Sequence, residues 1–187
     1  MKPETAKYTK ELEKLIVASD NILLISHINP DGDAIGAQLA LYHYLKSKGR
    51  IAGMITPNNL QEFLLWMEGA ELINVFIRNR QLCREMIQNA GLIIMLDFNQ
   101  TNRLGEAEQY VMESKARKVI IDHHLNPDPF ADLLISDPSV CSTSELLYVL
   151  IRGMNGEPFS SKPFAEALYI GIITDTGNFD HGNYTGD

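Results

Sequence analysis

Apolar residues occur along this chain in short continuous runs, separated by longer segments of mixed polarity. The runs at 21–26, 51–56, 92–96 and 118–121 consist mainly of Ile, Leu and Val, and 133–136 is a weaker fifth run. Runs of this length are typical of strands that are buried on both faces of a sheet. The pattern therefore predicts four strands and a fifth, weaker one.

The segments between these runs have the spacing of amphipathic helices. Leu12, Leu15 and Ile16, for example, recur on one face of a helix. Ser142 and Glu145 have the spacing of a capping box, which marks a helix start. We expect helices over residues 3–18, 34–48, 60–67, 78–90, 105–114, 145–152 and 162–173. Alternating strands and helices predict an α/β fold, with a doubly wound, mostly parallel sheet and helices on both faces.

Composition and charge narrow the classes of protein. Hydrophobic residues make up 45% of the chain, enough for a folded core. No apolar run approaches the roughly 18 residues of a membrane span, and the N-terminal segment lacks a signal-peptide core. Cys83 and Cys141 lie far apart, so we expect buried, reduced thiols and a cytoplasmic protein. A net charge of −8 leaves no general basic surface for duplex DNA.

Ionisable side chains follow three of the predicted strands. The carboxyl ends of parallel strands open at one edge of a sheet, where ligands bind in open α/β folds. We therefore expect these groups to lie together, joined by a carboxylate from the end of the last helix. The set consists of His27, Asp31, Asp33, Asp97, Asp122, His123, His124 and Asp175.

Carboxylates that converge in this way repel one another, and cations relieve the repulsion. Several carboxylates and two imidazoles suit two divalent ions better than one. Oxygen-rich donor sets favour Mn²⁺ or Mg²⁺ over Zn²⁺, and the imidazoles favour Mn²⁺. Two bound cations would also give an acidic protein a site for phosphate.

Each signal has a structural interpretation as well. The Asn29–Gly32 segment is a strong turn signal, and Asp33 or Asp97 would serve as a helix or turn cap. Adjacent histidines occur on ordinary surfaces, and the segment after residue 173 reads as a helix-ending turn. The Ser142 region is interpreted only as a helix start. Their coincidence on one sheet edge favours the metal site.

Four segments of the chain resemble the sequence motifs of a known enzyme family. HINPDGDAIGA, LDFNQTNRLG, IIDHH and GIITDTGNF resemble, in order and spacing, the four motifs of the DHH phosphoesterases. The resemblance covers residues 15 to 180 and is strongest to bacterial oligoribonucleotidases (nanoRNases) and 3′-phosphoadenosine-5′-phosphate phosphatases. RecJ-type exonucleases, cyclic-dinucleotide phosphodiesterases and family II pyrophosphatases share the same motifs.

The resemblance implies a role for each residue of the set. His124 would face the scissile phosphate, and Asp122 would lie behind the histidines. Neighbouring residues on an extended segment point to opposite sides, so we expect that His123 and His124 do not bind the same ion. One Mn²⁺ would be held by His27, Asp31 and Asp97, and the other by Asp33, Asp97, His123 and Asp175, with Asp97 as the bridge; Mg²⁺ or Co²⁺ would be substitutes.

The domain boundaries follow from the same resemblance. Residues 1–180 would form the DHH catalytic domain, and 181–187 would begin a linker. Relatives carry a second, substrate-binding (DHHA1-type) domain, and nothing in this chain corresponds to it. The Asp180–Gly182 segment also stands where relatives have basic or small polar residues.

The resemblance implies a manganese-dependent phosphoesterase that hydrolyses short single-stranded RNA or 3′-phosphoadenosine-5′-phosphate with a two-metal-activated water. Arg103 is either a phosphate contact or a solvated surface residue. We expect no membrane association and a homodimer of the full-length protein. The alternatives are a cyclic-dinucleotide phosphodiesterase or pyrophosphatase with the same ions, a non-catalytic nucleotide-binding module, and an anion-binding domain without metal.

Overall fold

The computed structural model describes residues 3–180 and contains one six-stranded sheet. The strand order is β3-β2-β1-β4-β5-β6, and all five pairings are parallel. The predicted α/β fold is therefore confirmed. The strands are β1 (Asn21–Ile25), β2 (Ile51–Thr56), β3 (Asn74–Val75), β4 (Leu92–Leu96), β5 (Arg117–Asp122) and β6 (Leu133–Ser136).

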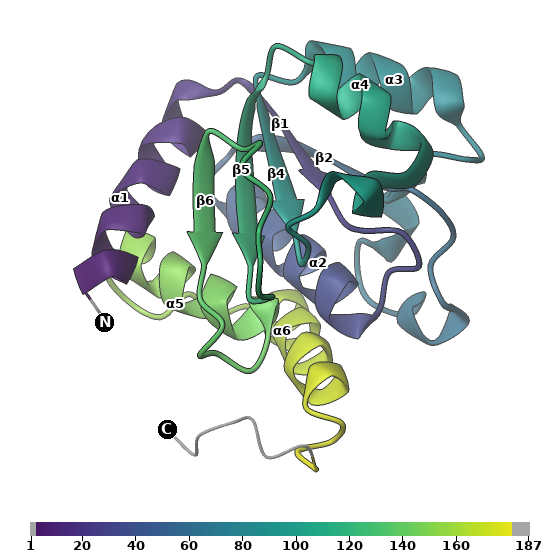
Figure 1. Cartoon of the computed structure of the whole chain (residues 1–187). Coiled ribbons are helices and arrows are strands. Elements are labelled where there is room, and N and C mark those ends of the chain that lie inside the picture. The colour runs from purple at the N-terminus through teal and green to yellow at the C-terminus, as the bar shows by residue number, and fades with distance from the viewer. Residues whose placement is uncertain (1–2, 181–187) are drawn as a thin grey trace.

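Helices cover both faces of the sheet (Figure 1). One layer packs α2 and α6 against each other, with α5 and α1 beside them; α3 and α4 lie on the opposite face. The helices are α1 (Pro3–Ala18), α2 (Gly32–Ser47), α3 (Arg80–Asn89), α4 (Glu108–Glu113), α5 (Thr143–Asn155) and α6 (Lys162–Asp175). The doubly wound arrangement expected from the sequence is thus present.

Two hydrophobic cores explain why the strands are continuous apolar runs. Leu24 and Ile94 face the core beneath α2, α5 and α6, whereas Leu23 and Ile93 face the core beneath α3 and α4. Successive side chains alternate between these cores, so neither face of a central strand can be polar. Burial of each such side chain contributes about 1.5–3 kcal/mol to folding.

Two expected helices differ from the structure. Residues 60–67 contain only a short 3-10 helix, η1 (Glu62–Leu64), because only Leu64 and Met67 are fully buried and no side chain caps the turn. The helix expected over 105–114 is replaced by a 3-10 helix, η3 (Thr101–Ala107), followed by the short α4. Gly105, with φ +54 and ψ −135, breaks the helical path between them.

Strand β3 was not predicted, because two residues are too few to form an apolar run. The segment before it is fixed instead by polar contacts. Asn58 exchanges two hydrogen bonds of 2.6 Å with Asn29, and the Gln61 amide donates to the Pro30 carbonyl at 3.2 Å. These bonds attach the segment to the loop that follows β1.

Helices α2 and α6 approach each other closely through glycines. A Cβ at Gly36 would lie 2.5 Å from the Ala167 carbonyl oxygen, and one at Gly32 would collide with the Thr174 side chain. Only glycine allows this separation. The close packing brings the end of α6, which carries Asp175, beside the beginning of α2.

Two further expectations concern exposure. Cys83 and Cys141 are buried and unpaired, as expected. Among residues 3–180, no helix has the length and apolarity needed to cross a membrane. The linker expected at 181–187 lies outside the described residues.

Candidate metal centre

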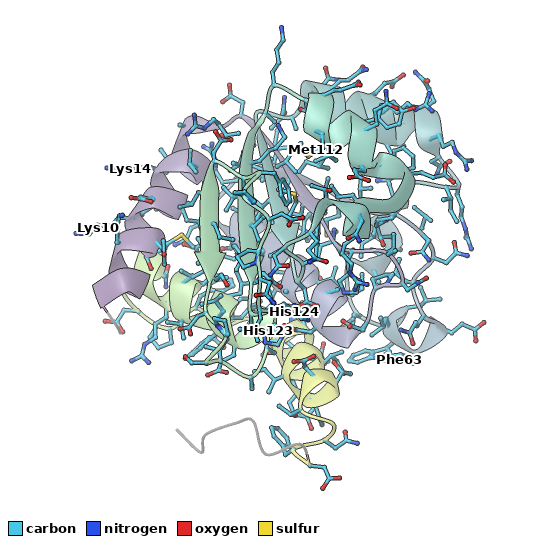
Figure 2. The ribbon with its side chains drawn as sticks, viewed as in Figure 1. Lys10, Lys14, Phe63, Met112, His123 and His124 are labelled. Atoms are coloured by element: carbon cyan, nitrogen blue, oxygen red, sulfur yellow. The ribbon has the colours of Figure 1, made fainter. Side chains whose placement is uncertain are left out.

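The ionisable residues singled out from the sequence meet at the carboxyl edge of the sheet. They follow β1, β4 and β5, and β1 and β4 are the neighbours at which the strand order reverses. This switch point is the usual ligand crevice of doubly wound folds. Figure 2 shows His123 and His124 at this edge, beside the end of α6.

The loop after β1 supplies His27 and Asp31. The buried His27 ring directs Nε2 toward Asp31 Oδ2, at 3.7 Å, and toward Asp97 Oδ2, at 3.4 Å. Burial lowers the pKa of His27 and so favours the neutral ring. Asp31 also caps α2, because its Oδ1 accepts from the backbone N–H groups of Asp33 and Ala34. Asp31 therefore combines two roles, because Oδ1 caps α2 while Oδ2 faces His27.

Asp97 ends β4 in the left-handed region, with φ +67, and its side chain is almost fully buried. Its Oδ2 faces His27, while Oδ1 lies 3.8 Å from His123 Nε2. Oδ1 also accepts a hydrogen bond of 2.8 Å from the Thr143 hydroxyl. Burial, and then the neighbouring carboxylates of Asp33 and Asp31, raise the pKa of Asp97 well above its ordinary value.

Asp33 is held by the beginning of α5. Its two oxygens accept backbone N–H bonds from Thr143, at 2.6 Å, and Ser144, at 2.9 Å. The positive end of a helix dipole favours a carboxylate at this place. Burial nevertheless raises the pKa of Asp33 to about 6.

Thr143 and Ser144 are the site residues that the sequence analysis missed, since the Ser142 region was interpreted only as a helix start. Ser142 does cap α5, accepting from Glu145 N at 3.0 Å. A signal was nevertheless available. Helices that return across a parallel sheet begin at its carboxyl edge, so a capping box there places free N–H groups among the carboxylates.

The two adjacent histidines do not point to opposite sides, which corrects the expectation from an extended segment. β5 ends at Asp122, so the alternation of a strand does not extend to the next two residues. The rings of His123 and His124 are 4.6 Å apart between centroids, in an edge-to-face arrangement. They differ in exposure, at 13% for the His123 side chain and 54% for His124.

His123 directs an unsatisfied atom into the site. Its buried Nε2 has no hydrogen-bond partner among the described residues. The same atom lies 3.4 Å from Asp175 Oδ2 and 3.8 Å from Asp97 Oδ1. A buried nitrogen that faces two carboxylates without hydrogen-bonding to either is what a cation held by all three groups would need.

Asp122 contacts His124 rather than both histidines. Its Oδ1 lies 2.7 Å from His124 Nδ1, and its Oδ2 accepts from the His124 backbone N–H at 3.0 Å. The hydrogen bond to Asp122 is the main reason that the pKa of His124 is raised. The pair therefore fixes the ring and directs Nε2 away from Asp122.

Arg103 lies at the site and is half-buried. Its Nη2 is 3.0 Å from His27 Nδ1, and its carbonyl accepts from the Ile28 N–H at 2.8 Å. A proton on His27 Nδ1 would be donated to the Ile28 carbonyl, 2.7 Å away, whereas a lone pair on Nδ1 would accept a hydrogen bond from the Arg103 guanidinium. The two contacts therefore need different tautomers of His27. Beside the carboxylates is a cavity of about 400 Å³ lined by Asp97, Phe98, Asn99, Gln100, Arg103, His124 and Leu125.

The described residues contain three groups whose candidate ligand atoms all lie within 4.8 Å of one another. Carboxylates and imidazoles in this proportion fit Mn²⁺ or Mg²⁺. Asp97 belongs to two of the groups, one with His27 and Asp31 and one with the two histidines, and His123 links the latter to Asp33 and Asp175. The groups are His27–Asp31–Asp97, Asp33–His123–Asp175 and Asp97–His123–His124.

Comparison with known proteins gives a family match over most of the chain. Residues 21–172 match the family described as "DHH family, N-terminal domain". The chain is 33% identical over 180 residues to the bifunctional oligoribonuclease and PAP phosphatase NrnA of Bacillus subtilis. That alignment covers 94% of this chain and 52% of the relative.

Two further relatives extend the comparison. The chain is 28% identical to the cyclic-di-AMP phosphodiesterase PdeA of Listeria monocytogenes, covering 91% of this chain and 27% of that one. A crystal structure of an exopolyphosphatase-related protein from Bacteroides fragilis superposes with a TM-score of 0.92 and 39% identity, covering 96% and 53%. The chain thus spans about half the length of NrnA and of the Bacteroides protein.

Proposed function

This chain belongs to the DHH family, and from that premise we propose that it is the catalytic domain of a manganese-dependent phosphoesterase. The observation that carries the proposal is the position of Asp97. Its two oxygens face His27 and His123, which belong to different ligand groups. One buried carboxylate between two such groups is the arrangement that a two-metal centre needs.

We assign the ligands as the sequence resemblance implies. When bound, two such cations supply a water of lowered pKa and neutralise charge on the phosphoryl oxygens. The oxygen-rich donor set favours Mn²⁺, with Mg²⁺ or Co²⁺ as weaker substitutes. One ion is assigned to His27, Asp31 and Asp97. The other is assigned to Asp33, His123 and Asp175, together with Asp97, whose Oδ1 lies 3.8 Å from His123 Nε2.

His124 is proposed as the catalytic acid. With Nδ1–H donated to Asp122, the ring holds its second proton at Nε2. The raised pKa of His124 keeps more of the ring protonated near neutral pH. The proton is then available to the oxygen that leaves phosphorus, and Asp122 fixes the direction in which it is offered.

Arg103 and the adjacent cavity are proposed to receive the substrate. A guanidinium beside a 400 Å³ cavity suits a phosphate, and the exposed Gln100 amide offers a further polar contact. We propose short oligoribonucleotides and 3′-phosphoadenosine-5′-phosphate as substrates, since the Bacillus relative is named for both. The Listeria relative makes cyclic dinucleotides the second candidate class.

We further propose a cytoplasmic protein whose full-length form is a homodimer, with a second domain beyond the catalytic one that grips the substrate. The second domain is supported by the length of the NrnA relative, of which the alignment with this chain covers 52%. Residues 1–187 would then bind metal and turn over nucleotides poorly, because the binding energy that orients the phosphate is missing.

A hydrolysis panel tests the proposal. The protein is stripped of metal, reloaded with Mn²⁺, Mg²⁺ or Co²⁺, and offered a short RNA, 3′-phosphoadenosine-5′-phosphate, a cyclic dinucleotide and pyrophosphate. We expect Mn²⁺ to activate best and the first two substrates to be preferred. Activity that survives exhaustive chelation would contradict the metal mechanism, and Mn²⁺ binding without any turnover by a full-length protein would favour a binding module.

A further inference from the structure

Thr143 hydrogen-bonds to two of the buried carboxylates of the site, those of Asp33 and Asp97. Its backbone N–H donates to Asp33 Oδ2 at 2.6 Å, and its hydroxyl donates to Asp97 Oδ1 at 2.8 Å. The residue is fully buried. The negative charge of Asp33 opposes ionisation of Asp97. Thr143 gives each of these two repelling carboxylates a hydrogen-bond donor.

The side chain of Thr143 is not required to begin α5. The N-cap is Ser142, whose hydroxyl accepts from Glu145 N. The Glu145 carboxylate in turn accepts from Cys141 N at 2.7 Å. The capping contacts are complete without the Thr143 hydroxyl, which leaves the bond to Asp97 as the hydrogen bond that this hydroxyl makes.

The orientation of Asp97 is what this bond controls. The backbone at φ +67 sets the direction of Cβ, but rotation about the last bond of an aspartate has a broad energy profile. Rotation would exchange or misplace the oxygens that face His27 and His123. A donor fixed to Oδ1 holds the carboxylate plane, so that each oxygen stays toward its own ligand group.

We propose that Thr143 is a positioning residue that holds the Asp97 carboxylate in the plane that bridges two metal ions. This inference rests on the proposed two-metal function. It assigns to the start of α5 a role in the metal centre besides its role in the helix. Loss of the hydroxyl should weaken the coupling between the ions before it weakens the fold.

Three variants separate the role of the hydroxyl from that of the helix start. Thr143→Val keeps the shape and removes the hydroxyl, while Thr143→Ser keeps the hydroxyl. Ser142→Ala removes the cap and leaves both Thr143 bonds in place. Thr143→Ala serves as a second hydroxyl-free variant if valine impairs folding, and circular dichroism with thermal melting checks each protein.

The measurement is Mn²⁺ binding to metal-stripped protein, followed by elemental analysis and electron paramagnetic resonance. We expect the unmodified protein and Thr143→Ser to bind two Mn²⁺ with the spectrum of a spin-coupled pair. Thr143→Val should bind the second ion about tenfold more weakly and show a changed coupling. Its kcat should fall with little change in KM, because no substrate contact is removed. Ser142→Ala should melt at a lower temperature with an unchanged spectrum.

Failure of the two-metal proposal and failure of the Thr143 role give different results. An unmodified protein that binds no coupled pair would overturn the two-metal proposal and this inference with it. A coupled pair in the unmodified protein, with unchanged affinity and coupling in Thr143→Val and Thr143→Ala, would overturn the positioning role alone. A Thr143→Ser protein that behaves like the valine variant would also overturn it, because the hydroxyl would then not be the active group.

Discussion

The two edges of the sheet carry cavities of similar size and opposite character. At the amino edge, between β1, β2 and α3, lies a cavity of about 500 Å³. Its lining includes the exposed apolar side chains of Ile51 and Leu82 and the flexible Met86. The cavity at the carboxyl edge is smaller, at about 400 Å³, yet it adjoins Asp97, Arg103 and His124. Convergent chemistry, rather than the larger volume, marks the functional edge.

The direction of the helices explains the difference. α2 and α5 both begin at the carboxyl edge, where their free N–H groups bind carboxylate oxygens of Asp31 and Asp33. Helix starts carry partial positive charge, so carboxylates are stabilised at this edge. The same two helices end toward the amino edge, where they offer no free N–H groups. Substitutions at each edge test this difference.

The largest effect is expected from Asp97→Asn. The amide keeps the shape but loses the charge that lies between two cations, so turnover should fall by about 1,000-fold or more. The metal-free protein should keep a near-normal melting temperature, because removing a crowded carboxylate offsets lost contacts. Mn²⁺ should then add little to that temperature. Elemental analysis showing two tightly bound Mn²⁺ and near-normal turnover would refute the bridging role.

His124→Ala should keep both metals and lose rate. Removal of a general acid costs about 100-fold or more in kcat. Asp122→Asn, which leaves the ring but weakens its orientation, should cost less. Steady-state kinetics and Mn²⁺ titration on the same samples test both. Loss of a metal ion in His124→Ala would instead make His124 a ligand.

The stability of the metal-free protein should fall as pH rises. Burial raises the pKa of Asp33 to about 6, above the value of about 4 in an unfolded chain. Its contribution is therefore present below pH 4 and is lost as pH passes 6, at about 1 kcal/mol per pH unit. The lowered pKa of His27 acts in the opposite direction, so the Asp33 part must be isolated.

Melting temperatures of two proteins between pH 4.5 and 7.5 isolate the contribution of Asp33 to stability. Asp33→Asn cannot ionise, and its melting temperature should decline less with pH than that of the unmodified protein. Mn²⁺ should stabilise the unmodified protein more as pH rises, because the ion competes with protons for the same carboxylates. Parallel pH profiles for the two proteins would contradict the raised pKa of Asp33.

Glycine substitutions compare the edges directly. In Gly171→Ala, the new Cβ would collide with the Ser144 hydroxyl and lie 2.7 Å from Asp33 Oδ1. We expect a loss of about 1–3 kcal/mol in stability and weaker Mn²⁺ binding. Gly91→Ala, near the amino edge, is the control, because its nearest atom would be 3.7 Å away. Denaturant unfolding in which both variants lose equal stability would refute the close-packing argument.

The smallest effect is expected at the amino edge. Ile51 is 72% exposed, and Ile51→Thr keeps a β-branched residue in the strand. Stability should change by no more than about 0.5 kcal/mol. Turnover should stay the same. A tenfold loss of turnover would show that the cavity at this edge takes part in function.

Much of the fold was predictable because its signals are local. Apolar runs located β1, β2, β4 and β5, since strands buried on both faces admit few polar residues. The two-residue β3 has no such signal. The region over 60–67 misled because half of its apolar residues are exposed, as Phe63 is in Figure 2. The segment is held instead by amide contacts of Gln61 and of the preceding Asn58.

The ionisable members of the site were predictable from their places after strands. Their partners were not. Thr143 meets Asp33 across 110 residues of sequence, and no local pattern indicates which helix start faces which carboxylate. The orientation of His124 also depended on where β5 ends, since a strand that continued through both histidines would have separated the two rings.

The packing of α2 against α6 has a consequence for how the protein folds. α6 is the last described helix, and it brings Asp175 to carboxylates that follow the first strand. Contacts of such long sequence separation form slowly, after local structure has formed. During synthesis, the buried carboxylates would therefore wait for the final helix before their site exists. A metal ion that binds only the assembled site would stabilise the folded state after α6 has packed.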